Sequence, residues 1–314
     1  MPRAGRGHRH AGAMLVRALD DVARLVLPVS CPGCDRPDMR WCAACLGLLR
    51  APLRRREDGA PRLDRLDGTG PLPVWAPAAY AGPVRGVVVA WKDRARADLD
   101  RPLAAVGRAA GVALGPVLAA GARAAAAVRT APAVRTAPAV RAAPGAVPRE
   151  LVVVPAPSAP AARRARGRDP VAVLARSVAA GLRAAGVRAQ VVPLVRQRGR
   201  ARDQVGLGSR ARGARLRGVE VARRPGRVRD ALRDRTPCLL VDDVLTTGAT
   251  LAACESALAG AGVPVLGAFV LAATPAPGER RGPRRVPSSG PRGGRAQGPS
   301  ARAPLVLPGT RGGG

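Results

Sequence analysis

The sequence predicts an α/β fold in which a parallel sheet is flanked by helices, and two observations support this. Four short apolar segments alternate with two segments of helical pattern in the C-terminal half of the chain, and strands that are apolar throughout are typical of a parallel sheet covered on both faces. With 314 residues, of which 47% are hydrophobic, the chain can form a core of its own. The expected strands are residues 151–157, 187–195, 238–244 and 263–272, and the expected helices are 170–186 and 248–262.

Residues 1–30 are predicted to be a basic segment followed by an amphipathic helix, because apolar residues fall at helical spacing. These residues are Met14, Leu15, Ala18, Val22 and Leu25. Asp20 and Asp21 interrupt what would otherwise be the apolar region of a secretion signal. The sequence contains no run of 18 apolar residues, so it predicts no membrane-spanning helix. We therefore expect a cytoplasmic protein with no membrane insertion.

The main domain is expected at residues 74–275, where residues 74–104 are predicted to form one or two strands leading into a helix. The hexapeptides AVRTAP, AVRTAP and AVRAAP fill residues 127–144, and a proline in every sixth position forbids a helix there. Residues 121–148 are therefore expected to be a disordered insertion. The tail, residues 276–314, consists mainly of Pro, Gly, Arg and Ser and is also expected to be disordered.

Four closely spaced cysteines define an N-terminal module at residues 31–50. They are Cys31, Cys34, Cys42 and Cys45, in the arrangement CxxC-x7-CxxC. In a reducing compartment, two such pairs favour a closed, structural Zn²⁺ site, with disulfides or unliganded thiols as the alternatives. Cys238 and Cys254 lie in an expected strand and helix and are predicted to be buried apolar residues.

The segment CLLVDDVLTTGATL, residues 238–251, predicts a phosphate site. Two acids end an apolar strand, where ligands of open α/β sheets bind. The backbone N–H groups and hydroxyls at the start of the following helix can cradle an anion, and Gly248 permits close approach. A ribose 5-phosphate fits these groups; its contacts would be Asp242, Asp243, Thr246, Thr247, Gly248, Ala249 and Thr250.

This segment has two other interpretations. One is a strand that simply ends in two exposed acids before a capped helix, although a cap needs one Thr or Asp rather than the whole series. The other is the Walker B strand of a nucleotide hydrolase. That class also needs a G-K-[ST] phosphate loop, and the single lysine of the chain, Lys92, follows Trp91 rather than a glycine.

The segment LLVDDVLTTGAT resembles the phosphoribosyl-pyrophosphate (PRPP) motif of type I phosphoribosyltransferases. Together with the four-cysteine module, it resembles the ComF family, relatives of a bacterial competence protein implicated in DNA uptake. Tyr80 and Lys92 match family positions. Further matches are Pro155, Pro157, Arg164, Arg166 and Gly167 in one segment and Arg196, Arg198, Gln204, Gly206 and Leu207 in another. Arg168, Asp169 and Pro170 depart from the family pattern.

The resemblance implies a type I phosphoribosyltransferase-like domain that binds PRPP or a nucleotide with Mg²⁺ and could transfer a phosphoribosyl group, which is glycosyltransferase chemistry. The candidate pyrophosphate-binding residues are Lys92, Arg164, Arg166, Arg196 and Arg198. No residue is singled out as catalytic, and the acceptor and the oligomeric state are not predicted.

The alternative function is non-catalytic nucleic-acid binding in DNA uptake or processing, with single-stranded DNA as the partner. It is favoured by the formal charge of +32 and by fourteen arginines against four acids in residues 196–235. Aromatic residues make up only 2% of the chain, so bases would find few side chains to stack on, and binding would be to phosphate and salt-dependent. A pure interaction protein with a vestigial PRPP site is a third reading.

Overall fold

The computed structural model describes residues 29–65, 70–130, 150–158, 163–164, 166–197, 218–222, 225–276 and 278. The α-helices are α2 (Ala43–Leu48), α3 (Gly82–Asp93), α4 (Asp100–Thr130), α6 (Pro170–Ala184), α8 (Arg227–Arg233) and α9 (Ala249–Gly260). Three short 3-10 helices are η1 (Glu57–Gly59), η2 (Pro61–Leu63) and η3 (Ala97–Leu99). The strands are β1 (Arg54–Arg55), β2 (Val74–Ala76), β3 (Ala78–Ala79), β4 (Glu150–Pro155), β5 (Arg188–Val191), β6 (Val195–Gln197), β7 (Val219–Val221), β8 (Cys238–Leu245) and β9 (Val265–Ala273).

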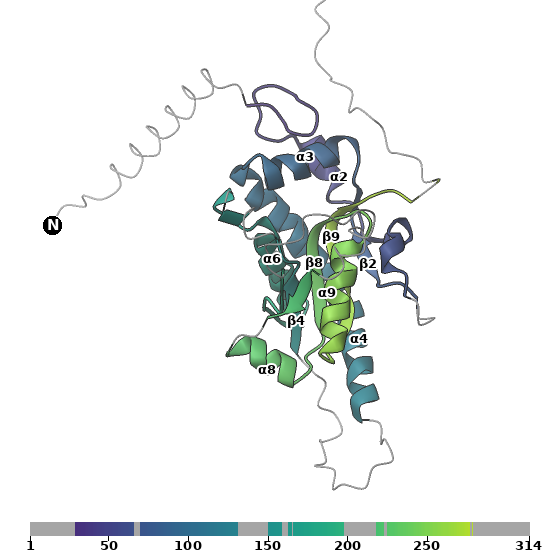
Figure 1. Cartoon of the computed structure of the whole chain (residues 1–314). Helices are drawn as coiled ribbons and strands as arrows, with labels where there is room; N and C mark the ends of the chain where they lie inside the picture. Colours follow the sequence, from purple (N-terminus) through teal and green to yellow (C-terminus); the bar gives the residue numbers. More distant parts are fainter. Residues whose placement is uncertain are drawn as a thin grey trace, which may run out of the picture.

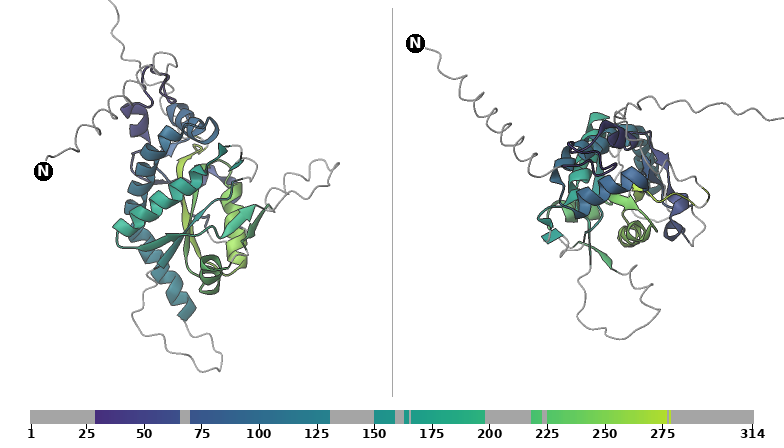
Figure 2. Two further views of the ribbon diagram at one scale, coloured as in Figure 1. Left: turned by 90° about the vertical axis from the view of Figure 1, so that its left-hand side faces the viewer. Right: turned by 90° about the horizontal axis from the view of Figure 1, so that it is seen from above.

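The main sheet has the strand order β1-β2-β9-β8-β4-β5, with β3 paired to β9. Every pairing in it is parallel except the one between β1 and β2. Helices cover both faces of this sheet, which makes a three-layer α/β arrangement (Figures 1 and 2). The predicted α/β fold class is confirmed, and the central strands β4, β8 and β9 are buried, as their continuous apolar sequences indicate.

The sheet separates two hydrophobic cores. One lies between the sheet and the cysteine module, α3, α4 and α6, and its largest buried side chains include Trp91, Phe269 and Leu103. The other lies beneath α8, α9 and the small antiparallel sheet of β6 and β7. Because aromatic residues are so scarce, Val, Leu and Ala form most of both cores.

Helices α4 and α6 pack through glycines. A Cβ atom at Gly181 of α6 would overlap the Arg108 carbonyl oxygen of α4, and one at Gly111 of α4 would overlap the Val178 carbonyl oxygen of α6. Helix backbones come this close only where no side chain separates them. The glycines therefore set the distance between the two helices.

Two expectations need correction. The segment expected as one strand at 187–195 is divided: β5 ends at Val191, and β6 leaves the main sheet to pair with β7. Pro193 lies at the division, and it has no N–H group to continue a strand ladder. The expected insertion 121–148 also begins too early, because α4 continues to Thr130. Ala122 is buried, and the space above Gly121 is bounded by Leu266, so this part of the segment belongs to the fold.

Several expectations fall outside the described residues. They concern the N-terminal helix up to residue 28, the repeats from residue 131, the basic stretch 198–217 with Arg198, Gln204, Gly206 and Leu207, and the tail from residue 279. Seven of the fourteen arginines in residues 196–235 lie in the stretch 198–217, and nucleic-acid binding stays a prediction.

Within the described part of the chain, one helical stretch, Ala97–Ala125, is long and apolar enough to cross a membrane by length and composition, and 44% of its most apolar window is buried inside the fold. Its apolar side chains Leu103, Val106, Leu114 and Leu118 are buried in the core. A core helix passes the same test, so the stretch is weak evidence for a membrane span.

The glycine packing predicts the effect of two matched substitutions. Gly181→Ala should destabilise the protein by about 1–3 kcal/mol, because the new methyl group forces α4 and α6 apart. Gly260→Ala places its methyl group in open space at the end of α9, so its effect should be neutral or slightly stabilising. Urea denaturation of both variants measures the difference, and equal stabilities would contradict the proposed role of Gly181.

Candidate functional site

A cleft of about 420 Å³ opens at the carboxyl ends of β4 and β8, beside the last turns of α3. Pro155 lies opposite Val241, and the Ala156 N–H donates to the Val241 carbonyl at 2.8 Å, so the loop after β4 leaves the sheet beside the two acids. Of the residues singled out from the sequence, the cleft brings together Tyr80, Lys92, Pro157, Arg166, Asp242, Asp243, Thr246 and Thr250.

The two adjacent acids of β8 extend toward opposite faces of the sheet. Leu239 and Val241 belong to the core beneath α3, α4 and α6, whereas Leu240 belongs to the core beneath α9. Because side chains alternate along a strand, Asp243 lies on the α3 side and Asp242 on the α9 side. The two carboxylates therefore meet different partners.

Asp243 is 2% exposed and forms an ion pair with Lys92, whose Nζ lies 2.5 Å from Oδ2. A buried carboxylate requires such a partner. Burial by itself would lower the pKa of Lys92, but the interactions with Asp243 and with two further acids nearby together more than offset this and raise the pKa above its ordinary value of 10.5. Lys92 is thus an ammonium group, and 39% of its side chain is exposed at the cleft.

Asp242 lies in a less favourable environment for a charge. Burial and the nearby charge of Asp243 raise its pKa well above the ordinary value of 3.8, and the charge of Lys92 offsets this only in part. Its Oδ1 accepts a hydrogen bond from the Asp243 N–H at 2.8 Å. On the α9 side, the pKa of the Cys254 thiol is raised, mainly by burial and secondly by the charge of Asp242. The cleft therefore holds one compensated and one uncompensated carboxylate.

The loop after β8 turns at a glycine and leads directly into α9. Gly248 has φ 80° and ψ −1°, a left-handed conformation that favours glycine, and a Cβ there would lie 2.7 Å from Leu63 Cγ. The Arg62 N–H donates to the Thr247 carbonyl at 3.1 Å, so η2 holds the loop in place. Thr246 and Thr250 line the cleft, while Thr247, Gly248 and Ala249 form the entry into α9. The Ala249 N–H donates to Thr247 Oγ1 at 3.5 Å, and the other N–H groups in the first turn of a helix favour an anion such as phosphate.

The candidate arginines separate into distinct environments. Arg166 lines the cleft with a side chain that is 13% exposed; its Nε is buried without a hydrogen-bond partner, and its Nη1 lies 4.0 Å from Asp93 Oδ1. Arg164 is exposed and does not line the cleft. Arg196 lines a neighbouring cavity of about 290 Å³, where its Nη2 lies 2.8 Å from Glu220 Oε1.

Sequence reasoning overlooked Ser158 and Gln197, which line both the cleft and the neighbouring cavity. Their signal was position: Ser158 follows Pro155 and Pro157, and Gln197 lies between Arg196 and Arg198. The residues that depart from the family pattern have local structural roles. Asp169 caps α6, accepting from the Ala172 N–H at 3.1 Å, and Pro170 occupies its first turn.

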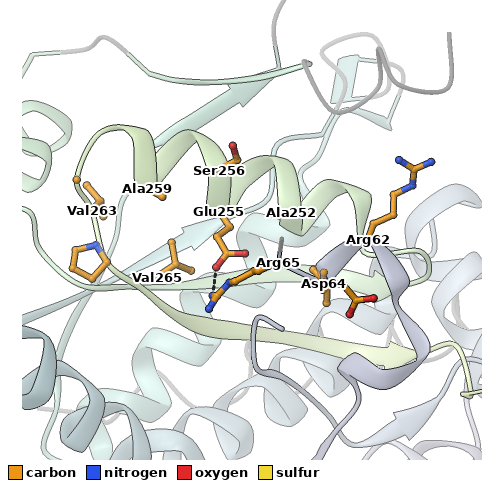
Figure 3. A pocket seen from close by; sticks show the side chains of 12 residues that line it. Arg62, Asp64, Arg65, Ala252, Glu255, Ser256, Ala259, Val263 and Val265 are labelled. Carbon is orange, nitrogen blue, oxygen red and sulfur yellow. Dashed lines mark hydrogen bonds and ion pairs between the residues drawn. The ribbon is translucent and has the colours of Figure 1, made fainter. Parts of the chain in front are cut away.

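A larger depression, of about 780 Å³, lies between α9, the start of β9 and residues 62–65. Its polar groups include Arg65 and Glu255, which form an ion pair across it (Figure 3). It has neither the paired acids of β8 nor the glycine loop, so the smaller cleft is the better candidate on chemical grounds.

The four cysteines of the N-terminal module form one cluster, with all Sγ atoms of Cys31, Cys34, Cys42 and Cys45 within 4.8 Å of one another. A tetrahedral Zn²⁺ with Zn–S bonds of about 2.3 Å needs sulfurs about 3.8 Å apart, and Cys34 Sγ lies 3.7 Å from Cys42 Sγ. The cluster could hold a structural metal such as zinc.

Local contacts favour the thiolate form of Cys42. Burial opposes its ionisation, but the Cys45 N–H, 3.3 Å from the sulfur, and the neighbouring thiols lower its pKa to about 7. The thiolate is the form that binds metals.

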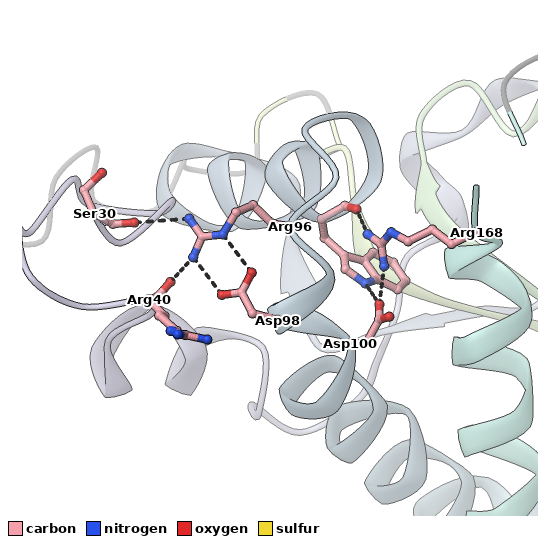
Figure 4. A network of polar contacts seen from close by, with 7 residues as sticks. Ser30, Arg40, Arg96, Asp98, Asp100 and Arg168 are labelled. Atoms are coloured by element: carbon pink, nitrogen blue, oxygen red, sulfur yellow. Dashed lines mark hydrogen bonds and ion pairs between the residues drawn. The ribbon is translucent and has the colours of Figure 1, made fainter. Parts of the chain in front are cut away.

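The cysteine module contacts α3 and the turn that follows it. A Cβ atom at Gly86 of α3 would overlap the Pro32 carbonyl oxygen, so the loop between Cys31 and Cys34 lies directly on the helix. After α3, the Arg96 guanidinium donates to the Ser30 and Arg40 carbonyls at 3.4 and 2.7 Å and pairs with Asp98 (Figure 4). The module is thus part of the structure that positions α3 and Lys92.

No protein-family model matches the chain, and no curated protein matches it. The assignment of a function therefore depends on the geometry of the cleft and of the cysteine cluster.

The unequal environments of the two acids predict opposite effects of the same substitution. Asp242→Asn should raise Tm at pH 8 by roughly 2–4 °C for each 1 kcal/mol of repulsion and burial penalty removed. Its Oδ1 can still accept from the Asp243 N–H. Asp243→Asn should lower stability by about 1–2 kcal/mol, because it leaves Lys92 without its partner.

The pH dependence gives the check on Asp242. Its folded-state pKa is raised, so the wild-type protein loses stability as pH rises through that pKa, and regains it as pH falls and the carboxyl takes up a proton. The advantage of Asp242→Asn should therefore shrink as pH falls. Thermal melts at several pH values test this, and an advantage that grows toward low pH would contradict the assignment.

Proposed function

We propose that the cleft binds PRPP together with Mg²⁺. The observation that carries the proposal is that three kinds of group surround one cavity. They are the two carboxylates near the end of β8, the threonines on either side of the glycine loop, and two cations, Lys92 and Arg166. Each group matches a different part of PRPP. The loop suits the 5-phosphate, the carboxylates suit the ribose hydroxyls, and the cations suit the pyrophosphate.

Arg166 supports the anionic part of this proposal. Its guanidinium is largely buried, its Nε has no hydrogen-bond partner, and its one ion-pair contact among the described residues, with Asp93, is long at 4.0 Å. Buried polar groups are normally hydrogen-bonded. The positive charge of Arg166 at the cleft would attract a pyrophosphate group, and Lys92 keeps further N–H donors beyond its contact with Asp243.

Mg²⁺ fits the same cleft through the oxygen atoms of Asp242 and Asp243, since it prefers oxygen ligands and commonly bridges a carboxylate and substrate phosphates. When bound, it would neutralise charge on the pyrophosphate. It would also relieve the repulsion that raises the pKa of Asp242. The proposal concerns binding; whether a phosphoribosyl group is then transferred is tested by measuring pyrophosphate release with a panel of nucleobases.

For the cysteine module, we propose zinc as the metal, with Cys31, Cys34, Cys42 and Cys45 as its four ligands. A closed set of four thiolates leaves no open position for a substrate, so the metal would be structural. Its contribution would be to hold the loop that lies on Gly86 and thereby the start of α3.

Calorimetric titration with PRPP and Mg²⁺ tests the first proposal. The double variant Asp242→Asn/Asp243→Asn should weaken PRPP binding by about ten-fold or more, because charge-assisted hydrogen bonds contribute about 1.5–3 kcal/mol. Asp230→Asn is the matched control, since Asp230 is exposed on α8, which precedes β8 and so lies at the other end of the sheet. Unchanged affinity in the double variant, or no binding by the wild-type protein, would refute the proposal.

Metal analysis tests the second proposal. The purified protein should contain one zinc per chain, and Cys42→Ser should reduce the content to well below half an equivalent and lower Tm, because structural zinc contributes folding free energy. Cys254→Ser is the control: this cysteine is equally buried but lies on α9, outside the cluster, so the variant should keep its metal. Zinc retained by Cys42→Ser would argue against a four-thiolate site.

A further inference from the structure

The end of α3 is held by a network that adjoins the cleft without lining it (Figure 4). Arg168 pairs through Nη1 with Asp100 Oδ1 and donates through Nη2 to the Trp91 carbonyl. Trp91, which is fully buried, donates from Nε1 to the same Asp100 oxygen at 2.6 Å. The Arg168 guanidinium also lies over the Trp91 ring, 6.0 Å from its centroid. One guanidinium thus joins the end of α3, the start of α4 and the turn before α6.

The Trp91 carbonyl is one of the last four in α3, which have no acceptor role within the helix. The Ala90 carbonyl, one residue earlier, accepts from the Arg96 N–H at 3.2 Å. A cation at a helix C-terminus is favoured by the helix dipole as well as by the hydrogen bond. Arg168 therefore stabilises the peptide unit that joins Trp91 to Lys92.

The same residue lies close in sequence to the second cation of the cleft. Arg166 is two residues before Arg168, in the turn that leads to α6, and only Gly167 separates them. Lys92 follows the carbonyl that Arg168 holds. The Arg168 side chain is largely buried, with 16% exposed. It is linked to Arg166 through the backbone, and to Lys92 through its hydrogen bond to the preceding carbonyl.

We propose that Arg168 is a positioning residue that sets the spacing between Lys92 and Arg166 for the pyrophosphate group of the ligand. The inference rests on the proposed function, because it assigns these cations to PRPP. The planar fork of arginine is needed, since it must reach a carboxylate and a carbonyl at once while lying over an indole ring. The phosphate loop at the start of α9 is not part of this network.

The test compares two ligands that differ only in the pyrophosphate. Calorimetry with Mg²⁺ measures the affinities for PRPP and for ribose 5-phosphate in the wild-type protein, Arg168→Met and Arg168→Lys. In both variants the affinity for PRPP should fall by about ten-fold, while that for ribose 5-phosphate should stay within about two-fold, because a ten-fold loss corresponds to the loss of about one well-placed charged contact. Arg176→Met, at an exposed position on α6, is the matched control and should change neither.

The Lys variant separates position from charge. It keeps a cation near the cleft but not the fork, so full PRPP affinity in Arg168→Lys would show that charge alone matters and would overturn the inference. An equal loss for both ligands would also overturn it, because that result indicates general damage to the domain. If Arg168→Met does not fold, Arg168→Lys carries the test. If the wild-type protein binds neither ligand, the proposed function fails, and this inference fails with it.

Discussion

The burial of Asp243 is the constraint on which the arrangement of the site depends. A carboxylate that is 2% exposed must be met by a cation, and Lys92 meets it from the last turn of α3. That helix must therefore end at the carboxyl end of β8. Its start is fixed by the cysteine module at Gly86, and its end by the contacts of Arg96 and Arg168. The candidate cleft is the space that remains between these elements.

The two acids of β8 show how a site can depart from what is best for the fold. Asp243 is compensated by Lys92, while burial and repulsion raise the pKa of Asp242 with little to offset them. A negative charge in a cleft that is offset only in part destabilises the free protein, and it attracts a cationic group of a ligand. Under the proposed function, a bound magnesium ion would remove this unfavourable contribution.

Much of the fold could be predicted from the sequence, because the evidence for it is local. Continuous apolar runs indicated β4, β8 and β9, Pro170 marked the start of α6, and the cysteine spacing indicated a cluster. The candidate site residues at 242–250 could be named because one segment supplies them. The contacts of Arg168 and the position of Gln197 beside the cleft could not be predicted, because the groups around them lie far away in the sequence or on another element. The division at Pro193 was missed because the residues directly on both sides of it, 191–192 and 194–195, are apolar, although the proline itself was visible.

The backbone contact between α4 and α6 constrains how this chain can vary. Gly111 and Gly181 lie where any added carbon would meet backbone atoms of the other helix. Glycine is the smallest residue, so every substitution at these positions adds volume between α4 and α6. Only a return to glycine at the same position restores the original distance between the two backbones. A leucine core can repack after a loss of volume by enlarging a neighbour. At this interface the neighbouring atoms belong to the backbone, so no change of a nearby side chain can make room for added volume.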